Sequence, residues 1–387
     1  MTRTASRAAV ITALCIATSG SARLAAQQAD ASLRLLAELV NANGAPGFEG
    51  PVRDILRREW QGVLTDVRAD GMGNLLGRLP GPAGAPRVLV MAHMDEVGFL
   101  VRYIDERGFV YMNALGGYID QSLLTQRFTI MTPQGPVVGF TGMKSGHIVS
   151  AEERSRLVAL QDMFLDIGAH SREEAEKLGV RPGLPVTYRT EFEELNGTGR
   201  YLARAWDDRV GLAVITEALR QVKSQTHANQ IEVAATVQEE IGLRGAAVVQ
   251  AGTNPDIVIN LEIGIAGDFP LLTSPKLSQE ALGKGPAVFV FDASMVPNNK
   301  FVEWTVRLAK QSNIPVQFEN VSGYGEDGSV LQRSAQGIPA LNIGIPTRYA
   351  HSQSGVIDRS DYDNTVKLVA QMLQKLSAAE VKGIREF

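Results

Sequence analysis

Histidine and carboxylate side chains repeatedly follow short apolar runs in this sequence. Runs of this kind, rich in β-branched residues, are typical of buried strands, whereas carboxylates are almost never fully buried unless they are paired. In an open α/β sheet the carboxyl ends of parallel strands meet at one edge, and ligands bind there. We therefore expect these side chains to converge at that edge. They are His93 and Asp95 after residues 87–92, Glu239 and Glu240 after 231–237, Glu262 after 256–261, and His351 shortly after 341–345.

This combination of residue types favours a metal centre. Histidine with carboxylates and no cysteine suits Zn²⁺, Co²⁺ or Mn²⁺. Two ions about 3.5–4 Å apart need two terminal ligand sets and one shared carboxylate. Asp207, at the start of a helix predicted over 208–222, is a further candidate ligand. Of the adjacent Glu239 and Glu240, one can bind metal while its neighbour carries a proton.

Each of these residues alone has a simpler interpretation. A single histidine such as His93 is usually structural or exposed, and Asp207 could be a helix N-cap. Glu239 and Glu240 could lie in a solvated loop, and Asp95 could cap a turn. Only the recurrence of the pattern at several strand ends favours the metal centre over these alternatives.

Composition and charge exclude some classes of function. The chain has 387 residues, of which 44% are hydrophobic and 21% charged, as in ordinary globular proteins. Its formal charge of −4 gives no basic footprint for nucleic acid. No apolar run reaches the roughly 18 residues of a membrane-spanning helix.

The N-terminal segment resembles a bacterial-type secretory signal. Arg3 and Arg7 precede a short apolar stretch over 8–17, and small residues follow. We predict a signal peptide over 1–26, with cleavage after Ala22 or Ala26, and therefore a secreted or periplasmic protein. The alternative is an uncleaved or disordered N-terminal helix. Cys15, the only cysteine, lies within this segment, so the mature chain would contain no thiol.

Most of the remaining chain alternates between apolar strands and helical patterns. This alternation predicts an α/β catalytic domain over 27–100 and 201–387, with a mainly parallel sheet between helices. The strands are predicted at 87–92, 231–237, 256–261, 287–291 and 339–344, and the helices at 208–222, 298–312 and 362–376.

Residues 101–200 do not show this alternation of strands and helices. A hairpin is predicted over 127–141, and a short strand over 186–190. Ser150 and Ser171 each begin a capping-box pattern for a short helix. We interpret 101–200 as a β-rich domain inserted into the α/β domain.

The candidate ligands lie within stretches that carry a family resemblance: MAHMDEVGF (91–99), ARAWDDRVG (203–211), TVQEEIGLRGA (236–246) and PTRYAHS (346–352). They resemble the tetrahedral, glutamyl and deblocking aminopeptidases, two-metal metallopeptidases that are also grouped as a cellulase-like FrvX family. Further likeness at 44–56, 70–77, 115–118 and 166–180 extends the resemblance over nearly the whole mature chain.

The resemblance implies a fold, an activity and an assembly. The fold is a catalytic α/β domain with an inserted β-barrel-like domain. The activity is removal of N-terminal residues from peptides by a water activated by two divalent ions, zinc first, with cobalt or manganese as alternatives. The assembly is a homo-oligomer formed through the inserted domain, which also acts as a lid, and many family members are dodecamers.

The resemblance also assigns a role to each candidate residue. Three histidines, at positions 147, 170 and 227, match no ligand motif of the family. Carried over by position, His93 and Glu262 would bind one metal, Glu240 and His351 would bind the other, Asp207 would bridge both, Glu239 would be the general base, and Asp95 would orient His93.

The sequence departs from the family pattern in several places. Glu262 stands where the family usually has aspartate, and Glu326 precedes Asp327 where it usually has threonine. Gly355 occupies a region where the family tends to have glutamate, and a secretory signal is unusual among well-known relatives. Two alternatives therefore stay open: a deacylase or carboxypeptidase on the same scaffold, and a catalytically silent binding protein of this fold.

Overall fold

The computed structural model describes residues 31–272 and 277–386. The signal segment predicted over 1–26, with Cys15, lies outside the described residues. Within the described part of the chain, no helix combines the length and apolar character needed to cross a bilayer.

The main domain is built on a mixed sheet whose centre is parallel. The four central strands are β12 (Gln230–Thr236), β3 (Arg87–His93), β13 (Ile257–Ile265) and β16 (Ala340–Arg348), each parallel to the next. Antiparallel strands extend both sides, so the predicted parallel sheet is confirmed at its centre only. On one side are β2 (Leu75–Leu79) and β1 (Thr65–Ala69), and on the other β17 (Gly355–Asp358), β11 (Arg200–Ala203) and β10 (Glu193–Glu194), while β14 (Ala287–Phe291) and β15 (Gln317–Asn320) branch from β16.

Helices cover both faces of this sheet, which is why its central strands are apolar at nearly every position. Alternate side chains of β3 enter two different cores: Val88 and Val90 belong to one, Leu89 and Met91 to the other. The first core is covered by a helix at 31–41 together with α2 (Gly50–Gln61), α5 (Trp206–Lys223), α7 (Asn299–Gln311), α9 (Arg359–Lys375) and α10 (Ala378–Arg385), and the second by α6 (Ala246–Thr253) and α8 (Asp327–Gln332).

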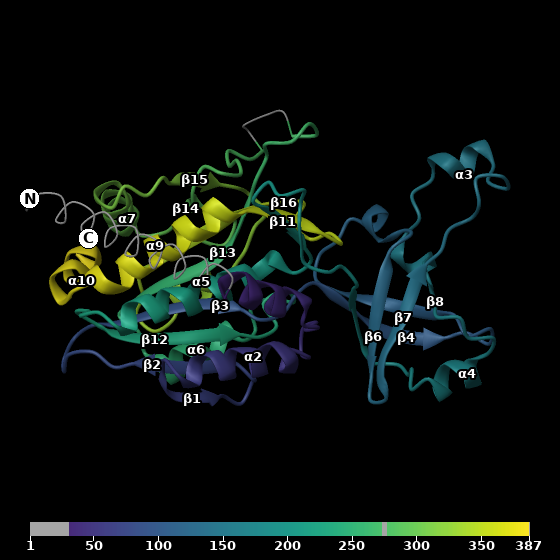
Figure 1. Cartoon of the computed structure of the whole chain (residues 1–387), viewed down its shortest axis with the longest axis horizontal. Coiled ribbons are helices and arrows are strands. Elements are labelled where there is room, and N and C mark those ends of the chain that lie inside the picture. The colour runs from purple at the N-terminus through teal and green to yellow at the C-terminus, as the bar shows by residue number, and fades with distance from the viewer. Residues whose placement is uncertain (1–30, 273–276, 387) are drawn as a thin grey trace, which may run out of the picture.

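A closed six-stranded barrel is inserted between β3 and β10 and projects from one end of the main domain (Figure 1). Its core combines aliphatic side chains with stacked aromatic rings: the Phe99 ring stacks on Tyr118 with centroids 4.5 Å apart, and Phe128 stacks on Tyr188 at 4.9 Å. The strands follow the closed order β4 (Gly98–Ile104), β5 (Val110–Leu115), β8 (Leu165–Asp166), β7 (Gly135–Thr141), β6 (Arg127–Thr132) and β9 (Pro185–Tyr188).

The predicted elements of this region are confirmed locally. β6 and β7 form the expected hairpin, with Thr132 opposite Gly135 at the turn. Ser150 caps α3 (Ala151–Ser155) in a reciprocal capping box with Glu153. Ser171 caps α4 (Arg172–Lys177), but the Glu174 carboxylate accepts the backbone N–H of His170, so the second box is not formed. The range predicted for the insertion, 101–200, also contains β10 and the first residue of β11, but these two strands pair into the main sheet through β17.

Candidate metal centre

The parallel register of the central strands brings the candidate residues to one edge of the sheet. His93, the last residue of β3, lies opposite Thr236, the last residue of β12. Asn260 of β13 lies opposite Met91 of β3, so Glu262, two residues further on, reaches the level of His93. The loop after β12 carries Glu239 and Glu240, and His351 follows the end of β16.

Two groups of metal-ligating atoms meet at this edge. One is formed by His93, Asp207 and Glu262, and the other by Asp207, Glu240 and His351. Within each group, one ligand atom from every residue lies within 4.8 Å of the others. These five residues are the ligand set predicted from the sequence, and the structure brings all of them together.

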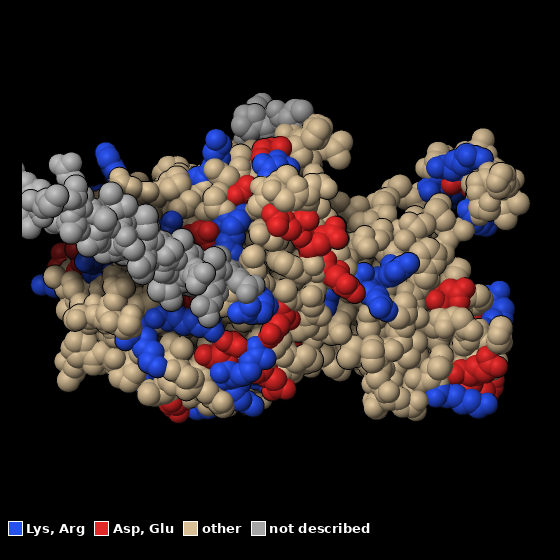
Figure 2. Space-filling model, in the orientation of Figure 1, with Lys and Arg blue, Asp and Glu red and all other residues tan. Residues whose placement is uncertain are grey.

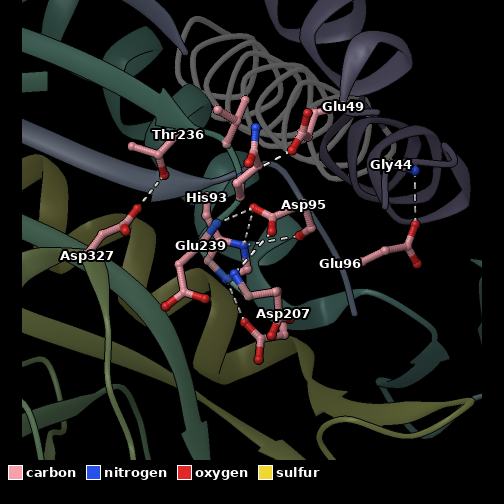
Figure 3. A network of polar contacts seen from close by, with 12 residues as sticks. Gly44, Glu49, His93, Asp95, Glu96, Asp207, Thr236, Glu239 and Asp327 are labelled. Atoms are coloured by element: carbon pink, nitrogen blue, oxygen red, sulfur yellow. Dashed lines mark hydrogen bonds and ion pairs between the residues drawn. The ribbon is translucent and has the colours of Figure 1, made fainter. Parts of the chain in front are cut away.

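Asp207 lies between His93 and His351. Its Oδ1 lies 2.9 Å from Nε2 of His93 (Figure 3), and its Oδ2 lies 3.2 Å from Nε2 of His351. The residue stands at the beginning of α5, a helix end that favours negative charge. Of the residues that the structure describes, Asp207 is the one shared by both donor groups.

Asp95 connects His93 to the loop that carries the two glutamates. Nδ1 of His93 lies 3.1 Å from the backbone oxygen of Asp95 and 3.5 Å from its Oδ1. The same carboxylate accepts hydrogen bonds from the backbone N–H of Glu239 at 3.0 Å and of Glu240 at 3.1 Å. Asp95 therefore lies where it can orient His93, and it also fixes the backbone of the Glu239–Glu240 pair.

Two residues that sequence reasoning did not single out hold the preceding part of this loop. Oε1 of Glu49 accepts the backbone N–H of Gln238 at 3.1 Å, and Oδ1 of Asn74 accepts that of Val237 at 3.0 Å. Gln238 needs this support because its φ of 55° is unfavourable for a side chain with a Cβ. The only sequence signal was that both residues lie within the stretches 44–56 and 70–77 of the resemblance.

The electrostatics of the two donor groups fit a divalent cation. Burial and the nearby Asp207 carboxylate raise the pKa of Glu240 to about 7, although His351 opposes this. Burial works against protonation of His351, yet the Glu240 carboxylate raises its pKa to about 9. Burial also raises the pKa of Glu262 well above its ordinary value. Oε1 of Glu240 is also buried without a hydrogen-bond partner. A cation between these carboxylates would stabilise their charged forms and would give this oxygen a partner.

A cleft of about 320 Å³ opens over these residues. Four members of the donor groups line this cleft: Asp207, Glu240, Glu262 and His351. Glu239 lines the same cleft but belongs to neither donor group, and its buried position raises its pKa well above the ordinary value. The remaining wall is formed by Leu243, Tyr324 and glycines 117, 242, 323 and 325.

The structure gives each departure from the family pattern a defined place. Glu262 belongs to the first donor group, and its Oε1 lies 3.8 Å from Nε2 of His93. Glu326 points away from the cleft into the interior, where Nδ2 of Asn342 donates to its carboxylate. Gly355 packs against Trp206: a Cβ at this position would lie 2.9 Å from the indole ring, which leaves no space for a glutamate.

The chain matches a known protein family over most of its length. The model of the M42 glutamyl aminopeptidases matches residues 73–368, which is most of the chain. The chain belongs to the M42 glutamyl aminopeptidase family. Both donor groups, Glu239 and Asp95 lie within the matched residues.

Individual members of this family are similar over nearly their full length. FrvX of Escherichia coli (strain K12) is 35% identical over 361 residues, covering 92% of this chain and 99% of FrvX. The crystal structure of a TET aminopeptidase from the marine sediment archaeon Thaumarchaeota archaeon SCGC AB-539-E09 has a TM-score of 0.88 at 37% identity, covering 91% of this chain and 99% of that one. Pyrococcus horikoshii TET1 peptidase, which can assemble into a tetrahedron or a large octahedral shell, has a TM-score of 0.81 at 29% identity, covering 89% and 100%.

Proposed function

We propose that this M42 family aminopeptidase is a dinuclear metalloenzyme with Glu239 as its general base. The observation that carries the proposal is the pair of donor groups sharing Asp207 beneath one cleft. His93 and Glu262 would complete one metal site, and Glu240 and His351 the other. Zinc is the first candidate because the donor set is histidine nitrogen and carboxylate oxygen, and cobalt or manganese would also suit it.

The residues of the chain divide the work of hydrolysis. When bound, divalent ions at such a site supply Lewis acidity and a nucleophilic water at neutral pH. Glu239 accepts the proton of the attacking water and passes a proton to the leaving amine. Asp95 holds Glu239 and Glu240 through their backbone N–H groups, and so keeps the base and its neighbouring ligand in register.

The carboxylates of the cleft give a reason for action at peptide N-termini. Asp207, Glu240 and Glu262 all reach the wall, so the free amino group of a substrate that enters the cleft would lie beside the two ions and their carboxylate ligands. The leaving group then carries the rest of the peptide. An acylated N-terminus lacks a basic amino group and should bind poorly.

The first experiment is metal analysis combined with a substrate panel. We expect bound divalent metal and hydrolysis of aminoacyl chromogenic substrates that have a free amine, with little hydrolysis of their N-acetylated counterparts. Hydrolysis of N-acyl amino acids instead would favour a deacylase, and release of C-terminal residues a carboxypeptidase. Metal-loaded protein that cleaves none of these substrates would favour the silent binding protein.

We further propose that the barrel domain mediates assembly into a homo-oligomer of the kind formed by TET1 peptidase. Large apolar side chains are exposed on this domain, including Ile119 at 70% exposure, Ile148 at 75% and Leu157 at 75%. Figure 2 shows Lys and Arg side chains gathered on the projecting segment around α3. Ile148 lies just before this helix and Leu157 just after it. An exposed surface that combines apolar and charged groups is typical of an interaction site.

Light scattering tests the assembly. The wild-type protein should have a mass several times that of the 41.7 kDa chain, with twelve chains as the expected number. The double variant Ile148→Asp, Leu157→Asp should dissociate into smaller species while keeping its fold by circular dichroism. Leu271→Asp is the control, because Leu271 is 91% exposed on the main domain. A monomeric wild type at micromolar concentration would refute the proposal.

Export remains a prediction that rests on the sequence of residues 1–26. Protein purified from its native host should begin near Arg23 or Gln27. N-terminal sequencing measures this directly, and an intact Met1 or Thr2 on cytosolic protein would refute it.

A further inference from the structure

The hydroxyl group of Tyr324 lies beside the ligand Glu262. Its Oη is 3.3 Å from Oε2 of Glu262 and 3.0 Å from the backbone oxygen of Ile263. The other carboxylate oxygen of Glu262, Oε1, lies 3.8 Å from Nε2 of His93. The two oxygens of Glu262 therefore have different surroundings: one faces the first donor group and the other faces a phenol.

Packing in the main domain fixes where this hydroxyl lies. The Tyr324 ring contacts Phe289 of β14, with ring centroids 5.7 Å apart and planes inclined by 43°. Phe289 is fully buried. Gly323, the residue before Tyr324, has a φ of 96°, a backbone conformation that only glycine adopts at low cost. The hydroxyl is thus placed by the core and the loop, and it does not depend on the presence of a substrate.

The side chain of a glutamate at position 262 is harder to hold in one conformation than that of an aspartate would be. Its extra methylene adds a rotatable bond, and ordering a longer side chain costs more conformational entropy. Residues that hydrogen-bond to a metal ligand orient it and tune the metal, and losing one typically costs 10–100-fold in metal affinity or activity. Tyr324 lines the cleft, and its hydroxyl group can donate a hydrogen bond to Oε2 of Glu262.

We propose that Tyr324 is a positioning residue that donates its phenolic hydrogen to Oε2 of Glu262 and leaves Oε1 for the ion shared with His93 and Asp207. This inference rests on the dinuclear site of the proposed function. The phenol has one hydrogen and two acceptors within reach, Glu262 and the Ile263 carbonyl. A carboxylate is a stronger acceptor than a backbone carbonyl, which favours the bond to Glu262.

The experiment measures Zn²⁺ binding to chelator-stripped protein by calorimetry, independently of any activity. Tyr324→Phe removes only the hydroxyl and keeps the ring on Phe289. We expect one of the two ions to bind roughly 10–100-fold more weakly and the other to bind as in the wild type. Tyr362→Phe is the matched control, because it removes a buried hydroxyl that contacts Ser32, in the packing of α9.

A double-mutant comparison separates action through Glu262 from a structural role. In Glu262→Asp the carboxylate is one methylene shorter and withdraws from the phenol, so adding Tyr324→Phe should change zinc affinity little. An equal loss in both backgrounds would assign the effect to the Ile263 carbonyl and overturn the inference, as would unchanged zinc binding in Tyr324→Phe. A wild type that binds fewer than two ions would overturn the dinuclear proposal itself.

Discussion

Glutamine in place of Glu239 should lower kcat by roughly 10²–10⁴-fold while both ions stay bound. The substitution keeps the size and shape of the side chain but removes its ability to accept a proton. Glu239 belongs to neither donor group, although it lines the same cleft, so metal affinity should change little. KM should also change little, because the group acts mainly in the transition state.

Steady-state kinetics with metal analysis on Glu239→Gln checks this expectation, and Glu240→Gln is the matched control. The neighbouring glutamate belongs to the second donor group, so its replacement should reduce bound metal, and added metal should partly restore activity. Added metal should not rescue Glu239→Gln. Full activity in Glu239→Gln, or metal loss there with retention in Glu240→Gln, would overturn the assignment of the base.

Replacing Asp207 by asparagine should have the broadest effect on metal binding. One oxygen of Asp207 faces His93 and the other faces His351, so a single substitution touches both sites. A neutral amide offers only one oxygen and no negative charge. We expect both ions to be lost or bound far more weakly, and activity to fall to the background of uncatalysed hydrolysis.

Calorimetric metal titration of Asp207→Asn, together with circular dichroism, measures this effect separately from folding. Asp208→Asn is an informative comparison, because Asp208 is adjacent and fully buried but belongs to neither donor group. This variant, if folded, should keep two metal sites. Two intact sites in Asp207→Asn would show that Asp207 does not bridge the ions.

The sequence predicted the central part of the fold because its strands are buried on both faces. The continuous apolar runs at 87–92 and 256–261 are typical of core strands, and they correspond to β3 and β13. The antiparallel flanks were not predicted: β1 and β10 carry many exposed polar residues, and the buried strands β2 and β17 are only five and four residues long. Their places in the sheet depend on pairing with partners distant in sequence, which one strand alone does not reveal.

The candidate ligands were predictable for a similar reason. Carboxylates that directly follow core strands are costly to bury unless they are paired or bind a cation, and this pattern indicated the edge of the sheet where the candidates meet. The family resemblance implied which five of them bind metal, and the structure brings those five together. The supporting residues were not predictable in the same way. Glu49 and Tyr324 act through contacts with Gln238 and Glu262 that arise only on folding. Their own sequence surroundings are glycine-rich turns, which indicate loops and no particular chemistry.

One measurement tests the dinuclear aminopeptidase most directly. Protein stripped with chelator is titrated with Zn²⁺ while hydrolysis of a short peptide with a free N-terminus is followed. We expect no hydrolysis by the stripped protein and full activity only when two equivalents of metal per chain are bound. Full activity at one bound equivalent, or hydrolysis that is unaffected by metal removal, would contradict it.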